Sequence, residues 1–159
     1  MRFAVCQFHM APNAVLVVAK DAEQGNPIVQ GLASVIPSSR VSVAGSTEEA
    51  RGRLEELRAK TGLPAFVLVD LSASGSSGLE VLTWLRSRPE YQPVPVVVMH
   101  SEHDGIHVDR AYKAGANSCL VRPGKSAELR QLLQAIATYW ICHNVSRGAN
   151  PSSGGRFLA

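Results

Sequence analysis

Polar side chains follow four of the apolar runs in this sequence, at the point where each run ends. They are Lys20 and Asp21 after residues 14–19, Asp70 at the end of residues 65–70, His100 and Ser101 after residues 94–99, and Arg122 after residues 118–121. In a parallel sheet the carboxyl ends of the strands share one edge, where ligands and chemistry gather. The sequence therefore predicts its chemistry at that edge, around the one carboxylate that ends a run, Asp70.

Three neighbouring histidines suggest a metal site as an alternative. His103 and His107 are four residues apart, and His100 precedes them. Gly105 lies between His103 and His107, and the next helical pattern starts only there, so the two do not form a ligand pair on one helix. We therefore expect a chance group of loop histidines and no metal site.

The segment Pro123–Ser126 (PGKS) ends like a phosphate-binding P-loop. The first glycine of that motif would fall at Cys119, so the loop cannot form as it does in nucleotidases. Neither a GxSxG elbow nor an HExxH pair occurs, and nothing supports a hydrolase. We expect a protein that is not an enzyme.

Five apolar runs alternate with helical patterns along the chain. The predicted strands are residues 14–19, 41–44, 65–70, 94–99 and 118–121, and the predicted helices follow them at residues 27–35, 47–61, 79–85, 106–114 and 127–141. Runs that are apolar throughout are typical of strands covered on both faces. The alternation predicts a doubly wound, parallel α/β sheet.

Residues that favour helix ends flank these helical patterns. Asn26, followed by a proline, and Ser46, with Glu49 at the capping-box spacing, are expected N-caps. Ser126 is expected to cap the final helix, and Gly115 to end the helix before it.

The composition indicates one domain. The chain has 159 residues, of which 45% are hydrophobic and 18% charged, so it can bury a core and is not disordered throughout. We expect an N-terminal extension at residues 1–12, the domain at residues 13–143 and a disordered tail at residues 144–159. The tail is too short for a helix-turn-helix, and the net charge of +3 is spread along the chain, so we expect no binding to nucleic acid.

The sequence also indicates the compartment. No apolar run approaches the roughly 18 residues of a membrane span, and the N-terminus is a poor secretion signal. The three cysteines, Cys6, Cys119 and Cys142, are widely spaced and lack a CxxC pair. We expect reduced cysteines without a disulfide framework, no membrane contact and a cytoplasmic location.

The stretch from residue 65 to residue 139 resembles the receiver domain of two-component response regulators. VDLSASGSSGLEVL (69–82) is similar to the phosphoacceptor strand and loop of that family, with Gly78 eight residues after Asp70. AYKAGANSCLVRP (111–123) is similar to its strand-five block, above all in single-domain receivers that partner phytochromes. The resemblance follows the element order over residues 14–141. It implies the flavodoxin-like receiver fold, a five-stranded sheet of order 2-1-3-4-5.

The resemblance also implies a chemistry, the transfer of a phosphoryl group from a kinase histidine to Asp70. Such a transfer uses a divalent cation held by two strand-one acids, a strand-four hydroxyl and a strand-five lysine, and an aromatic residue reports the change. By the most direct alignment the acid positions are Ala19 and Lys20, the hydroxyl position is His100 with Ser101 beside it, the lysine position is Arg122 and the aromatic position is Cys119. A cis peptide before Pro123 is implied as well.

The register of the strand-one acids is left open by the sequence. A slip of one residue would place Lys20 and Asp21 at the acid positions and keep one carboxylate. Only in that register do we expect Mg²⁺, held by Asp21 and Asp70. Otherwise we expect no cofactor.

Two functions follow from the resemblance. The first is a stand-alone, atypical receiver in a phosphorelay, in which Asp70 accepts phosphate from a histidine kinase, of the phytochrome type or another, and Arg122 with His100 or Ser101 supports the phosphoryl group. The second is a pseudo-receiver, a binding module that is not phosphorylated and whose pocket is locked by Lys20, Asp70 and Arg122. Both act by contact with other proteins.

The final helix carries Tyr139 and Trp140 beyond the length that covers a sheet edge. Part of its apolar stripe must pack on the domain core. A stripe this wide also fits a symmetric surface, and we expect a homodimer formed through this helix.

Overall fold

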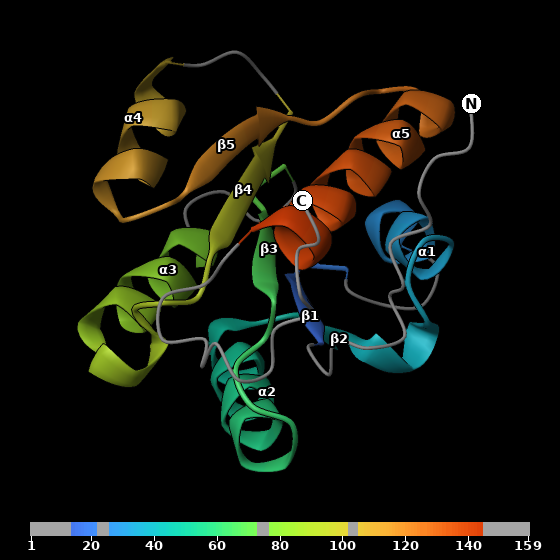
Figure 1. The fold of residues 1–159 in the computed structure, drawn as a ribbon. Helices are drawn as coiled ribbons and strands as arrows, with labels where there is room; N and C mark the ends of the chain where they lie inside the picture. The colour runs from blue at the N-terminus through green and yellow to red at the C-terminus, as the bar shows by residue number, and fades with distance from the viewer. Residues whose placement is uncertain (1–13, 22–25, 73–76, 102–104, 145–159) are drawn as a thin grey trace, which may run out of the picture.

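The computed structural model describes residues 14–21, 26–72, 77–101 and 105–144 (Figure 1). The predicted extension at residues 1–12 and almost all of the predicted tail lie outside these ranges.

The sheet has the predicted number, direction and order of strands. It comprises β1 (Val15–Val18), β2 (Val41–Ala44), β3 (Phe66–Asp70), β4 (Val96–His100) and β5 (Ser118–Val121). All pairs are parallel, and the order is β2-β1-β3-β4-β5. Every residue of β1, β3 and β4 is buried, as expected for strands covered on both faces. The fourth strand begins after Pro95, which has no N–H for the ladder, and extends through His100, one residue beyond the predicted end.

Two layers of helices cover the sheet. The helices are α1 (Pro27–Ala33), α2 (Thr47–Lys60), α3 (Ser77–Ser87), α4 (Gly105–Lys113) and α5 (Ser126–Ala137). Two 3₁₀ turns (Ser38–Arg40 and Pro89–Tyr91) and a π-helix after α5 (Thr138–His143) complete the described elements. Side chains of α1 and α5 pack with Val97 and Met99, and those of α2, α3 and α4 pack with Val96 and Val98. Figure 1 shows α1 and α5 together on one side of the sheet and α2 and α3 on the other.

Two of the three predicted N-caps are confirmed, although several helix bounds differ from the predicted ones by one or more residues. Asn26 Oδ1 accepts from the N–H of Ile28 at 2.9 Å, and Ser46 Oγ accepts from that of Glu49 at 3.1 Å. The expectation for Ser126 is wrong. Ser126 is the first helical residue of α5, and Lys125 occupies the cap position without a side-chain hydrogen bond.

Arg86, on α3, ties together the loops at the amino end of the sheet. Its Nε donates to the Gly115 carbonyl at 2.9 Å, and its Nη1 donates to the carbonyls of Gln92 and Val94 at 3.1 and 3.0 Å. Its Nη2 donates to Asn117 Oδ1 at 2.8 Å. Burial lowers the pKa of the Arg86 guanidinium, but a guanidinium stays charged even so.

Gly115, which ends α4, provides the close approach that this arginine needs. Its φ of +104° suits a residue without Cβ. A Cβ built at Gly115 would lie 2.7 Å from Cγ of Arg86. The glycine therefore ends the helix, as predicted, and also makes room for the arginine.

The cysteines differ from expectation. Cys119 is free, but Cys142, in the π-helix, is disulfide-bonded, so the expectation of reduced cysteines is wrong for Cys142. Widely spaced cysteines give no sign of pairing in a sequence, because pairing depends on which chain ends the fold brings together. Cys6 lies outside the described residues.

None of the helices in the described ranges is long and apolar enough to cross a membrane.

Candidate functional site

Asp70 is the last residue of β3 and is almost completely buried, with 2% of its surface exposed. Its Oδ1 accepts from the backbone N–H of Ser72 at 3.0 Å and from the Ser72 hydroxyl at 2.5 Å. An Asp whose side chain accepts from the residue two places on closes a short turn, here at the exit from the strand. A buried carboxylate needs such partners, because burial without them is costly.

Arg122 follows β5 and reaches the same carboxylate. Its backbone N–H donates to the His100 carbonyl at 2.7 Å, which extends the ladder between β4 and β5. Its Nη1 donates to Asp70 Oδ2 at 3.0 Å and to Ser72 Oγ at 3.1 Å. Asp70, Ser72 and Arg122 thus form one closed group of side chains, the Asp70 cluster. The structure brings Asp70 and Arg122 together, as the sequence predicted.

The expected cis peptide before Pro123 is wrong, because no peptide bond among the described residues is cis. Arg122 reaches Asp70 without one. Its backbone is held at the sheet edge by the hydrogen bond to His100, and its long side chain covers the remaining distance.

His100, at the end of β4, is 5% exposed, and its Nε2 has no hydrogen-bond partner among the described residues. Buried polar atoms are seldom left in this state. Ser101, the other candidate for the strand-four position, is exposed. Of these two residues, only His100 is enclosed by the fold near the edge where Asp70 and Arg122 meet.

The strand-one positions contain no acid beside Asp70. Val18 pairs with Val69, so Ala19 comes next to Asp70 in the same register. Ala19 is buried, and its N–H donates to the Ala44 carbonyl at 3.0 Å. The residue next to the acceptor position is thus Ala19, one of the two residues that the direct alignment places at the acid positions. Asp21 is exposed, and its backbone carbonyl accepts from the Asn26 side chain at 3.2 Å.

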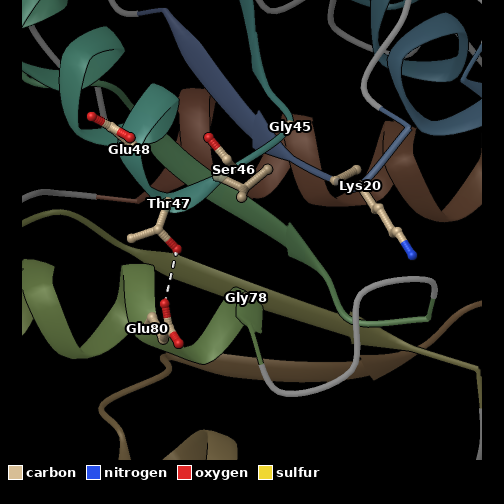
Figure 2. Close-up of a pocket in the computed structure, with 9 residues that line it drawn as sticks. Lys20, Gly45, Ser46, Thr47, Glu48, Gly78 and Glu80 are labelled. Carbon is tan, nitrogen blue, oxygen red and sulfur yellow. Dashed lines mark hydrogen bonds between the residues drawn. The ribbon is translucent and has the colours of Figure 1, made fainter.

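Lys20 does not form the predicted lock. Its side chain is exposed, and no ion pair between Lys20 and Asp70 occurs within the described ranges. Lys20 instead borders a cavity of about 540 Å³ between the N-terminal ends of α2 and α3. Figure 2 shows the lysine extending away from that cavity's Ser46 and Thr47, while Thr47 donates to Glu80 across it at 3.5 Å. Within the described ranges, Arg122 forms an ion pair with Asp70 at 3.0 Å.

These residues do not fit the divalent cation that the resemblance implies. A hard cation of this kind needs several carboxylate or carbonyl oxygens. Ala19 offers a methyl group and Lys20 a positive charge, and both oxygens of Asp70 already accept hydrogen bonds. In the described part of the chain, no group of three potential ligands from His, Cys, Asp and Glu comes together. Asp21, on which the expectation of Mg²⁺ depended, is exposed.

Cys119, at the predicted aromatic position on β5, is half-buried, and burial raises the pKa of its thiol. Its backbone N–H donates to the Tyr112 hydroxyl at 3.2 Å. Tyr112 is on α4 and half-exposed. This contact places an aromatic side chain beside the predicted position, but from a different element.

Two residues of this region were missed by the sequence reasoning. Ser72 has a detectable signal, a serine two residues after a strand-terminal Asp. Tyr112 has none, because its contact with β5 depends on how α4 is placed. Of the neighbouring histidines, His107 is exposed on α4 and His103 lies outside the described residues.

Comparison with known proteins identifies the family of this chain. The profile of the response regulator receiver domain matches residues 15–134. A probable methanogenesis regulatory protein, FilR2 of Methanothrix harundinacea, is 31% identical over 63% of this chain and 67% of its own length. Response regulator Rcp1 of Synechocystis is 28% identical over 49% of this chain, and the match spans about half of Rcp1, 53%.

Solved structures show the same fold. The phosphorylated cyanobacterial phytochrome response regulator RcpA has a TM-score of 0.70 at 22% identity, covering 86% of this chain and 99% of its own. The Mn²⁺-bound form of Rcp1 has a TM-score of 0.67 at 21% identity, covering 85% of this chain and 99% of its own. With the family profile matched across the sheet and most of α5, this chain belongs to the response regulator receiver domain family.

Proposed function

We propose that this chain is an atypical receiver that acts in two-component signalling by contact with other proteins, with Asp70 as the phosphoacceptor position. The observation that supports this most directly is the pairing of Asp70 with Arg122 at the carboxyl ends of β3 and β5. A strand-end carboxylate beside a strand-five cation is the pair that phosphoryl transfer would use. The carboxylate oxygen would attack phosphorus, and the histidine of the kinase would leave.

His100 gives this proposal a second support. Its buried, unpartnered Nε2 could donate a hydrogen bond to a phosphoryl oxygen at the end of β4, and Ser101 is the alternative donor there.

The opposite version, a pseudo-receiver that is not phosphorylated, is favoured by a different observation. Both oxygens of Asp70 already accept hydrogen bonds from the chain's own side chains, which an incoming phosphoryl group would have to rearrange.

Intact-mass spectrometry separates the two versions. The chain is incubated with acetyl phosphate, with and without magnesium, beside the Asp70→Asn variant as the matched control. A phosphoryl adduct on the chain but not on the variant supports phosphorylation at Asp70. An unchanged mass under both conditions leaves the pseudo-receiver.

The proposed partner is a histidine kinase. RcpA and Rcp1 are response regulators, and RcpA is a phytochrome regulator, so a phytochrome-type kinase is the first to test. Phosphotransfer from such a kinase, or stable binding to it, would support the proposal. The non-enzymatic role, the cytoplasmic location and the absence of nucleic-acid binding stay predictions.

A homodimer through the end of α5 is part of the same proposal. Tyr139 is 53% exposed, and Trp140 meets it edge-on at a centroid distance of 4.9 Å while packing against the core. A cavity of about 460 Å³ lies beside Tyr139, lined by side chains of α5 and the π-helix. Sedimentation of the chain and of Tyr139→Ser tests this. A dimer that the substitution weakens supports the surface, and a monomer at all concentrations rules it out.

A further inference from the structure

The charge of Asp70 has to be balanced by something in the fold. A carboxylate that is 2% exposed has lost most of its hydration, and an uncompensated buried charge is strongly destabilising. A receiver of the usual composition would meet this demand with a divalent cation. Here Ala19, next to Asp70, offers only a buried methyl group, and the side chain of Lys20 is exposed.

Arg122 supplies a positive charge from the opposite side of Asp70. Its Nη1 lies 3.0 Å from Asp70 Oδ2, and only 24% of its side chain is exposed. A charge-assisted hydrogen bond of this length is among the stronger polar contacts in proteins. The position of the arginine is also fixed through its backbone, by the hydrogen bond from its N–H to His100.

Ser72 joins the two charged groups. Its hydroxyl donates to Asp70 Oδ1 at 2.5 Å and accepts from Arg122 Nη1 at 3.1 Å. A hydroxyl can do both at once, because it has one donor and two acceptor sites. The serine thereby holds Nη1 against the carboxylate, donating to Oδ1 while Arg122 donates to Oδ2.

From these contacts we propose that Arg122, positioned by Ser72, is the built-in counter-cation of Asp70, so that this acceptor pocket is charge-balanced without a divalent metal. The inference rests on the proposed function only in taking Asp70 as the acceptor position. It holds whether or not Asp70 is phosphorylated. If phosphorylation does occur, it proceeds equally with magnesium and with a chelator.

A titration with Mn²⁺ alone, followed by the electron paramagnetic resonance of the free ion, tests the metal part. The unaltered chain and Asp70→Asn are expected to give the same curve. Binding that is about tenfold or more tighter in the unaltered chain than in the variant would overturn the proposal, because removing a true ligand loses at least that much affinity. Asp70→Asn keeps the shape of the side chain, and the fluorescence of Trp84 and Trp140 reports whether the variant is folded.

The role of Arg122 and Ser72 is tested in the unaltered chain by nuclear magnetic resonance of arginine side chains. A guanidinium held by Asp70 and Ser72 rotates slowly, so we expect separate signals from its two terminal nitrogens. Arg130, exposed on α5, is the internal control and should give one averaged signal. Averaging at Arg122 as well would overturn the proposal.

Ser72→Ala should move the Arg122 signals toward averaging, and Ser72→Thr, which keeps the hydroxyl, should restore them. If Ser72→Ala leaves the Arg122 signals separate, or Ser72→Thr leaves them averaged, Ser72 does not position Arg122.

Discussion

Two arginines at opposite ends of the sheet show how differently this fold uses the same side chain. Arg86 uses Nε, Nη1 and Nη2, and it meets three backbone carbonyls and Asn117. Within the described ranges, the Arg122 side chain makes its hydrogen bonds through Nη1, to Asp70 and Ser72. At the amino end, three of the four acceptors are thus backbone carbonyls. The carboxyl end is held by two side chains that can rearrange.

The difference suggests a division of labour between the two ends. Backbone carbonyls cannot move without moving a loop, so Arg86 serves stability. A carboxylate and a hydroxyl can each take a new partner, so the contacts of Arg122 can be exchanged. Each of the following substitutions tests one side of this contrast by the free energy of unfolding in urea.

The largest effect is expected from Arg86→Met. This change keeps much of the apolar stem but removes the donor from the three backbone carbonyls, while Asn117 Oδ1 keeps the Val96 N–H. We expect a loss of about 3 kcal/mol. Arg130→Met, at an exposed site on α5, is the control and should change the unfolding free energy by less than about 0.5 kcal/mol. A loss for Arg86→Met as small as that of the control would refute its assignment to stability.

Arg122→Met should have a smaller effect. It leaves the buried carboxylate of Asp70 without its cation, and we expect a loss of about 2 kcal/mol, less than for a fully buried pair because Arg122 is partly exposed. Adding Asp70→Asn should recover part of that loss, since the neutral amide needs no cation. A double variant less stable than Arg122→Met would show that the charge of Asp70 is balanced by another group.

Gly115→Ala tests whether the absence of a side chain at Gly115 makes room for Arg86 at the amino end of the sheet. The positive φ and the short distance to Arg86 both oppose a Cβ at this position, and we expect a loss of about 1.5 kcal/mol. Gly52, in the middle of α2, is the matched control, because a Cβ there meets nothing within 4 Å. Gly52→Ala should instead gain about 0.5 kcal/mol. Equal effects at the two glycines would contradict the close approach to Arg86.

The smallest effect is expected at the start of α5. Lys125 has the extended backbone of an N-cap but makes no capping hydrogen bond, so Lys125→Ser should gain about 0.5 kcal/mol. The ion pair that it removes, with Glu128 at 3.8 Å, is exposed and contributes little. A loss of unfolding free energy in Lys125→Ser would show that Lys125 already stabilises the start of α5.

The sheet was predictable because burial on both faces leaves an unbroken apolar run in the sequence. The strands around Leu16, Leu68 and Val97 are such runs, and their alternation with helices allowed few topologies. The place of Asp70 at the end of β3 was predictable for a related reason, because a carboxylate that ends a fully apolar run stands out in the sequence. The observed strand bounds differ slightly from the predicted ones for local reasons. The fourth strand, for example, begins after Pro95 because proline has no N–H for the ladder.

The contacts between side chains were harder to predict. Lys20 and Arg122 were both candidate partners of Asp70, and only the register of β1 on β3 and the reach of the arginine decided between them. The contact of Arg86 with Asn117 joins residues 31 positions apart, and no local pattern marks it. Ser126 was assigned as a cap from its type, but the helix begins one residue earlier than that assignment required.

The Tyr112 hydroxyl has one more consequence, for self-association. β5 is an edge strand of the sheet, and an uncovered edge is a template on which a strand of another molecule can add. By accepting from the Cys119 N–H, Tyr112 occupies a backbone donor that such a strand would need. A tyrosine on a neighbouring helix therefore leaves one backbone donor fewer at this edge for a strand of another molecule.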